Sequence, residues 1–171
     1  MPGPGSTALR AGRRSGLRAV VVAGGVGMQD GVEYLGRCHC GALEARYRTA
    51  LPTVNWAVRT CQCSFCQAHQ ALYATDAAGL LQFETAEESL LQNYRFGLRQ
   101  ADFRLCRRCG IYVGAVYAEG ERRVGILNLR ILRPLPTDLA APAPMNFDGE
   151  SEGARTARWA ARWTPLAEGS A

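Results

Sequence analysis

Lysine is absent from this 171-residue sequence, histidine occurs only twice, and no apolar stretch approaches the length of a membrane span. The longest such stretch, residues 19–26, contains two glycines and falls far short of the roughly 20 residues that a transmembrane helix needs. The net charge of +5 comes from 20 scattered arginines, which form no basic run of the kind that marks nucleic-acid binding. The 19 glycines and 8 prolines show no period, which excludes collagen-like and repeat architectures. These absences disfavour both a membrane and a nucleic-acid partner.

Seven cysteines are present, and they fall into three tight clusters with the spacings C-x-C, C-x-C-x-x-C and C-x-x-C. In chain order the clusters are Cys38 and Cys40; Cys61, Cys63 and Cys66; and Cys106 and Cys109. An odd number of cysteines at such spacing is a poor disulfide framework, because one thiol is always left over. Metal ligands, in contrast, follow one another at such short spacings, whereas scattered core cysteines have no reason to. The clusters therefore predict metal ligation in a reducing compartment, the cytoplasm.

Glycines next to the cysteines indicate how the ligands divide. Gly41 follows Cys40 and Gly110 follows Cys109, and glycine takes the positive φ of a metal knuckle without steric cost. Two such knuckles predict one closed zinc site with four thiolates, which come from Cys38, Cys40, Cys106 and Cys109. The middle cluster lacks that glycine and offers only three thiolates. It would leave one position of a second tetrahedral zinc open, which is the pattern of a reactive ion.

Other groupings remain open from sequence. The C-x-x-C pairs of the second and third clusters could form a zinc ribbon, which would leave the other three cysteines unused. His69 lies three residues after Cys66, near enough in the chain to complete and close the middle site. His39 stands between two ligands, and its side chain is expected to point to solvent.

Hydrophobic alternation predicts a mainly β domain over residues 31–133. The strand-like segments are residues 43–47, 54–58, 80–83, 92–96, 102–105, 111–117 and 124–129, of which the last two should form a hairpin around Gly120. A capping-box pattern at Thr85 predicts one short helix that ends at Leu91. Small antiparallel sheets bury little apolar surface, so metal binding should supply much of the folding free energy.

The two ends of the chain differ from this central domain. Residues 1–30 are expected to form a poorly ordered extension, in which Met28 is an alternative start of translation. Residues 134–171 begin as a proline-rich connector. A terminal helix over residues 151–162 is expected to pack Trp159 and Trp163 against the domain.

The sequence resembles the family named for the glutathione-dependent formaldehyde-activating enzyme, which shares its domain with centromere protein V. The resemblance covers about residues 31–132, and its motifs are GRCHCG at 36–41, CQCSFC at 61–66, YRFG at 94–97 and CRRCG at 106–110. It implies a β-rich zinc fold of the β-tent type and the same division into four and three ligands. It also implies the family's nominal activity as a carbon–sulfur lyase, which joins glutathione to formaldehyde as S-(hydroxymethyl)glutathione.

Zinc held by three thiolates is better suited to binding a substrate thiol than to generating hydroxide. Attack of the thiolate on an aldehyde carbon would give a hemithioacetal. A thiol such as glutathione carries carboxylates, for which Arg59, Arg95 and Arg99 are candidate partners, while Tyr73 and Asp76 could assist proton transfer.

The predicted function is therefore addition of a small-molecule thiol to formaldehyde or another small aldehyde, with two zinc ions per chain. The alternative is a non-catalytic zinc-binding interaction module, in which both zinc ions are structural. Closure of the second site by His69 would favour that alternative.

Overall fold

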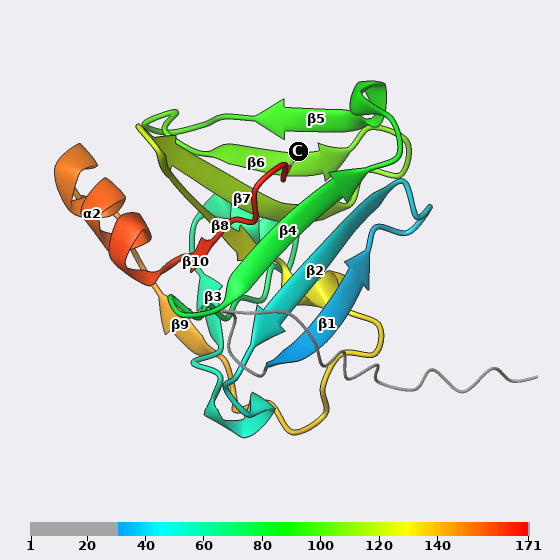
Figure 1. Cartoon of the computed structure of the whole chain (residues 1–171). Helices are drawn as coiled ribbons and strands as arrows, with labels where there is room; N and C mark the ends of the chain where they lie inside the picture. The colour runs from blue at the N-terminus through cyan, green and yellow to red at the C-terminus, as the bar shows by residue number, and fades with distance from the viewer. Residues whose placement is uncertain (1–30, 171) are drawn as a thin grey trace, which may run out of the picture.

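The computed structural model describes residues 31–170, so the expectations for residues 1–30, including the start at Met28, lie outside the described residues. The expected mainly β fold is confirmed (Figure 1). An antiparallel sheet with the strand order β1-β2-β4 is formed by β1 (Val32–Arg37), β2 (Leu43–Thr49) and β4 (Leu80–Thr85). Strands β3 (Arg59–Cys61) and β9 (Ala143–Met145) form a separate parallel pair.

The largest sheet has five antiparallel strands in the order β10-β8-β7-β6-β5. Its strands are β5 (Leu91–Tyr94), β6 (Asp102–Cys106), β7 (Tyr112–Glu119), β8 (Arg122–Leu127) and β10 (Thr164–Pro165). The predicted hairpin joins β7 to β8, and Gly120 adopts a φ of +57° in its turn. The helices are α1 (Ser64–Ala68), α2 (Glu152–Arg162) and the 3₁₀ turns η1 (Thr53–Asn55), η2 (Glu88–Leu90) and η3 (Leu129–Ile131).

The five-stranded sheet is covered on both faces. On one face, Leu81 and Phe83 of β4 pack with Val113 and Leu127 in the larger hydrophobic cluster. Gly114 lets the sheets approach, because a Cβ there would lie 2.6 Å from the Phe83 ring. On the opposite face, a second hydrophobic cluster contains side chains of β7 and β8 that pack with helix α2 and with the segment after β3. This second face carries the site described below.

Two predicted elements are wrong. Residues 54–58 form no strand: η1 turns the chain after Pro52, and the alternation reflects Trp56, which inserts edge-on between Tyr34 and Tyr47. The helix expected from Thr85 to Leu91 is reduced to η2. The hydroxyl of Thr85 donates to the Glu87 carbonyl and caps no helix, and Leu91 already pairs with Cys106 in the sheet.

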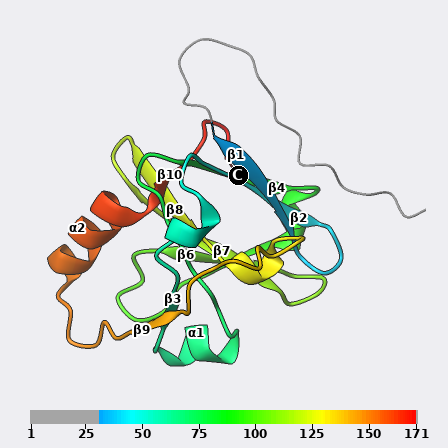
Figure 2. The ribbon, with the colours of Figure 1, turned by 90° about the horizontal axis from the view of Figure 1, so that it is seen from below.

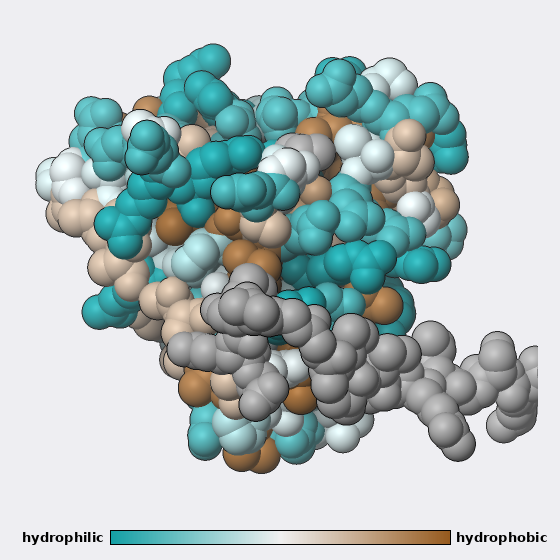
Figure 3. Space-filling view, in the orientation of Figure 1, coloured by the Kyte–Doolittle hydropathy of each residue, from teal (hydrophilic) through white to brown (hydrophobic). Residues whose placement is uncertain are grey.

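The C-terminal residues belong to the same body. Helix α2 begins where predicted, since the Ser151 side chain accepts a hydrogen bond from the Ala154 N–H at 3.3 Å, and Trp159 and Trp163 are buried as expected. Strands β9 and β10 pair with β3 and β8. Hydrophilic residues dominate the face in Figure 3, with apolar ones in separate patches. No helix among residues 31–170 is long and apolar enough to cross a membrane.

Candidate metal centres and the adjoining cavity

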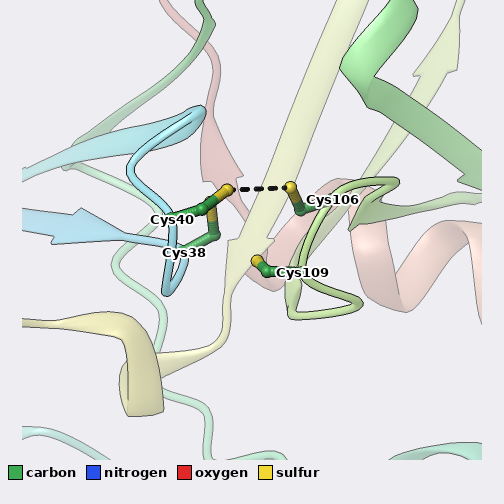
Figure 4. A group of neighbouring side chains, drawn as sticks. All are labelled: Cys38, Cys40, Cys106 and Cys109. Atoms are coloured by element: carbon green, nitrogen blue, oxygen red, sulfur yellow. Dashed lines mark hydrogen bonds between the residues drawn. The ribbon is translucent and has the colours of Figure 1, made fainter.

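Four cysteines meet where the β1–β2 loop faces the end of β6 and the loop that follows it. The side chains of Cys38, Cys40, Cys106 and Cys109 point toward one another (Figure 4), and their sulfurs all lie within 4.8 Å. The Sγ of Cys40 is 3.7 Å from that of Cys38 and 3.6 Å from that of Cys106. A tetrahedral zinc with Zn–S bonds near 2.3 Å separates its sulfurs by about 3.8 Å. The four-cysteine cluster therefore fits a metal ion without rearrangement.

The backbone around this cluster has the form of two metal knuckles. Gly41 and Gly110 adopt φ values of +77° and +73°, as their positions predicted. The N–H of Leu43 donates to the Sγ of Cys38 at 3.3 Å, although burial dominates and raises the pKa of that thiol to about 12. A buried thiol of this kind ionises readily only beside a cation, which a metal ion would supply.

The remaining three cysteines gather where β3 leads into α1. Cys61 ends β3, Cys63 is the N-cap of α1, and Cys66 lies within that helix; their sulfurs also lie within 4.8 Å of one another. A hydrogen bond between the side chains of Cys61 and Cys66 lowers the pKa of the Cys61 thiol to about 6. The same hydrogen bond, together with burial, raises the pKa of the Cys66 thiol. A zinc ribbon would need Cys63 and Cys66 to lie beside Cys106 and Cys109. These two pairs belong to different sulfur groups in the structure, so the chain does not adopt the ribbon grouping.

Neither histidine joins a group of mutually close ligand atoms within residues 31–170. The ring of His69 packs against Phe65 and Tyr112, with centroid distances of 4.5 and 5.5 Å, and burial lowers its pKa. His39 is exposed, as its position between two ligands predicted. The three-cysteine cluster thus has three protein ligands for a tetrahedral ion, which needs four.

Two buried tyrosines support this cluster from behind. The hydroxyl of Tyr73 lies 3.2 Å from the Sγ of Cys66 and 3.1 Å from the hydroxyl of Tyr112. Burial is the main reason that the pKa of each tyrosine is raised, so both hydroxyls keep their protons. The Tyr73 hydroxyl donates its one proton to the Tyr112 hydroxyl, and it can donate to an ionised Cys66 instead if Tyr112 becomes the donor in their bond. Tyr112 escaped sequence reasoning, although a tyrosine in a strand that is otherwise apolar needs a polar partner.

A cavity of about 630 Å³ opens onto the three-cysteine cluster. All three cysteines line it, together with Tyr73 and Tyr112, whereas the four-cysteine cluster contributes no lining residue. Strand β3, the loop of residues 96–101 and residues 145–163 surround it, and Figure 2 shows β3, β9 and α1 side by side. The four-cysteine cluster thus lies away from the cavity, and the three-cysteine cluster faces a space that can hold a small molecule.

The three candidate arginines occupy different places. Arg59 lines the cavity, where its Nη2 donates to Thr75 Oγ1 at 3.0 Å; burial, together with Arg158 and Arg162, lowers its pKa. Arg99 also lines the cavity.

Two further candidates lie elsewhere. Arg95 does not line the cavity, because its guanidinium is paired with Asp102 at 2.5 and 2.8 Å. Asp76 is also absent from the lining, and its carboxylate accepts a hydrogen bond from the Thr49 hydroxyl at 2.6 Å.

Sequence reasoning missed the lining residues of the C-terminal segment. Arg155, Arg158 and Trp159 face the cavity from one side of α2, and Glu150 accepts hydrogen bonds from Arg158 at 2.8 and 2.6 Å. The sequence does contain one indication of this arrangement: Arg155, Arg158 and Trp159 follow the spacing i, i+3, i+4, which places them on one face of a helix. It did not indicate which part of the domain that face covers.

Comparison with known proteins agrees with these features. The family model described as glutathione-dependent formaldehyde-activating enzyme matches residues 33–142. A crystal structure of a Rhodobacter sphaeroides protein is similar, with a TM-score of 0.51 and 31% sequence identity, over 65% of this chain and 99% of that chain. Among curated proteins, none matches. Because the family model spans more than half of the chain and carries all seven cysteines, this chain belongs to the glutathione-dependent formaldehyde-activating enzyme family.

Proposed function

We propose that this chain binds two zinc ions and adds a small-molecule thiol of the glutathione type to formaldehyde or another small aldehyde, as a carbon–sulfur lyase working in reverse. The observation that carries the proposal is the position of the three-cysteine cluster on the wall of the cavity. The four-cysteine cluster has the geometry of a closed structural site and contributes nothing to that wall. The two clusters would thus divide stability and chemistry between them.

The donor set of the three-cysteine cluster suits this role. A zinc ion held by Cys61, Cys63 and Cys66 would supply a centre that accepts the substrate sulfur and lowers the pKa of its thiol. The hydroxyl of Tyr73, donating to Cys66, would withdraw charge from that sulfur and fix its orientation. Tyr112, hydrogen-bonded to Tyr73, would hold the donor in place.

Arg59 is the proposed partner of a substrate carboxylate. It lies two residues before Cys61 on β3, so both side chains leave the same face of the strand, with Cα atoms about 7 Å apart. No ion pair occupies it within residues 31–170, and it faces the cavity. Arg99 would serve as a second cationic contact at the rim.

The reaction needs no reagent besides the two substrates. The thiol sulfur forms a bond to the carbonyl carbon, the π pair of C=O moves to oxygen, and the thiol proton ends on that oxygen. Holding both reactants in one cavity accelerates the step by proximity. Seven free thiols also suit a reducing compartment, and we place the protein in the cytoplasm.

Metal content and catalysed rate together test this function. Wild-type protein is expected to hold two zinc ions and to accelerate formation of S-(hydroxymethyl)glutathione above the uncatalysed rate. Cys66→Ser should hold one zinc, keep its fold and lose the acceleration, whereas Cys109→Ser should unfold. Two zincs with no acceleration would overturn the enzymatic proposal and favour a zinc-binding interaction module. Equal damage from both substitutions would show that the two ions do not have separate roles.

A further inference from the structure

The part of the chain after the family match builds one wall of the cavity. The match ends at residue 142, and β9 begins at Ala143. Strand β9 pairs with β3 so that Met145 lies opposite Cys61, and the N–H of Gln62 donates to the Met145 carbonyl at 2.9 Å. This segment, which lies beyond the matched residues, is therefore paired directly with the strand that carries the first cysteine of the three-cysteine cluster.

The segment presents three aromatic rings and Met145 to the cavity, beside the four charged residues Asp148, Glu150, Arg155 and Arg158. We call Met145, Phe147, Trp159 and Trp163 the C-terminal wall, and all four line the cavity. The two tryptophan rings lie 4.9 Å apart between centroids and are 8% and 6% exposed. Phe96, Phe103 and Ile126 from the domain line the same space. An apolar body placed here would be in contact with ring faces and edges.

Three charged residues of this region, Glu150, Arg155 and Arg158, hold the C-terminal wall together. The Arg158 guanidinium lies 3.7 Å from the centroid of the Phe147 ring, and Glu150 accepts two hydrogen bonds from it. Arg155 donates to the Phe147 carbonyl at 3.2 Å. Phe147 is thereby fixed from both its backbone and its ring. The wall is preformed, which lowers the entropy cost of binding against it.

We propose that the C-terminal wall is an aromatic-binding subsite that takes the body of the carbonyl substrate, so that aldehydes with an aromatic group are preferred over formaldehyde. The proposal rests on the function proposed above. The cavity of about 630 Å³ also has to hold the thiol, so its lining, and not its volume, favours an aromatic aldehyde: formaldehyde, with two heavy atoms and no apolar body, would leave the C-terminal wall without a contact. An aromatic aldehyde reacts by the same step, with its ring against Phe147 and its carbonyl carbon toward the cysteines.

Binding of benzyl alcohol to the zinc-loaded protein tests the subsite without any turnover, because this alcohol cannot add a thiol. Calorimetry should show one site per chain, and tryptophan emission should change in a Trp56→Phe background, which leaves only Trp159 and Trp163. Phe147→Ala should weaken binding about tenfold or more, since a benzyl group loses a buried ring contact. Phe147→Leu, which keeps apolar volume, should lose less.

Leu51→Ala is the matched control, because Leu51 is 39% exposed and does not line the cavity; its affinity should equal that of the wild type. Absence of binding, or binding that Phe147→Ala does not weaken in a folded variant, would overturn the subsite. Turnover gives the separate test of the proposed function: with glutathione, kcat/KM should favour benzaldehyde over formaldehyde, and Phe147→Ala should reduce that ratio. Benzyl alcohol binding at the wall without turnover of either aldehyde would refute the enzyme and leave the subsite standing.

Discussion

Removing the Tyr73 hydroxyl should weaken metal binding at one cluster and leave the other unchanged. The hydroxyl lies 3.2 Å from Cys66 Sγ and 3.1 Å from the hydroxyl of Tyr112, and both tyrosines are buried. Tyr73→Phe keeps the ring and its packing but leaves Cys66 without this donor. It also leaves the hydroxyl of Tyr112, a residue that is 1% exposed, without its partner.

The expected magnitude follows from these two contacts. A hydrogen bond to an ionised group contributes about 1.5–3 kcal/mol, and loss of an outer-shell partner typically costs 10–100-fold in metal affinity. Zinc affinity of the three-cysteine cluster should therefore fall by roughly 10–100-fold. The unpaired Tyr112 hydroxyl should lower the free energy of unfolding by about 1–3 kcal/mol. The four-cysteine cluster contacts neither tyrosine and should be unaffected.

Competition with a chromophoric chelator measures both sites in one titration. Wild type should release its two zinc ions in separate phases, and Tyr73→Phe should shift only the weaker phase. Tyr34→Phe, on β1 and outside the cavity lining, is the matched control and should match the wild type. A shift of both phases, or of neither, would refute the reasoning that Tyr73 acts through Cys66.

Three further predictions address the fold, the C-terminal wall and the ligand count. Gly114→Ala should destabilise the domain by about 1–3 kcal/mol in urea unfolding, because its Cβ would overlap the backbone carbonyl oxygen of Ile126 and the Phe83 ring. Glu150→Gln should lower the free energy of unfolding by about 1 kcal/mol at pH 7. Because Arg158 lowers the pKa of Glu150 in the folded state, this contribution is present above the unfolded-state pKa and is lost as the pH falls through the folded-state pKa, so the difference from the wild type should narrow progressively in acid. His69→Ala should keep both metal ions in elemental analysis, and loss of one would contradict three-cysteine ligation.

The cysteine clusters could be identified from sequence because metal chemistry restricts local spacing. Gly41 and Gly110 marked the closed cluster through their positive φ, which is a local property of the chain. Residues 54–58 misled the strand prediction, since alternation reports burial of Trp56 and not hydrogen bonding to a neighbouring strand. The same limit hid the hydroxyl pair of Tyr73 and Tyr112.

The C-terminal wall could not be predicted for a different reason. Ser151 predicted the start of helix α2, and Trp159 and Trp163 predicted a buried face. Neither feature indicates which surface of the domain that face covers. The parallel pairing of β9 with β3 decides that placement, and it joins residues more than 80 positions apart. Three-residue strands carry too little pattern for such pairing to be read from the chain. The cysteine clusters of the site thus follow from local motifs, whereas its C-terminal wall depends on strand pairing between distant parts of the chain.

The central claim is that the trio Cys61, Cys63 and Cys66 leaves one metal position for a substrate sulfur. The most direct test replaces zinc with cobalt and follows the visible absorption spectrum during a glutathione titration. The account predicts a saturable change at one thiol per chain, with a new sulfur-to-cobalt band, and no change in Cys66→Ser. A wild-type spectrum that stays indifferent to glutathione would contradict it.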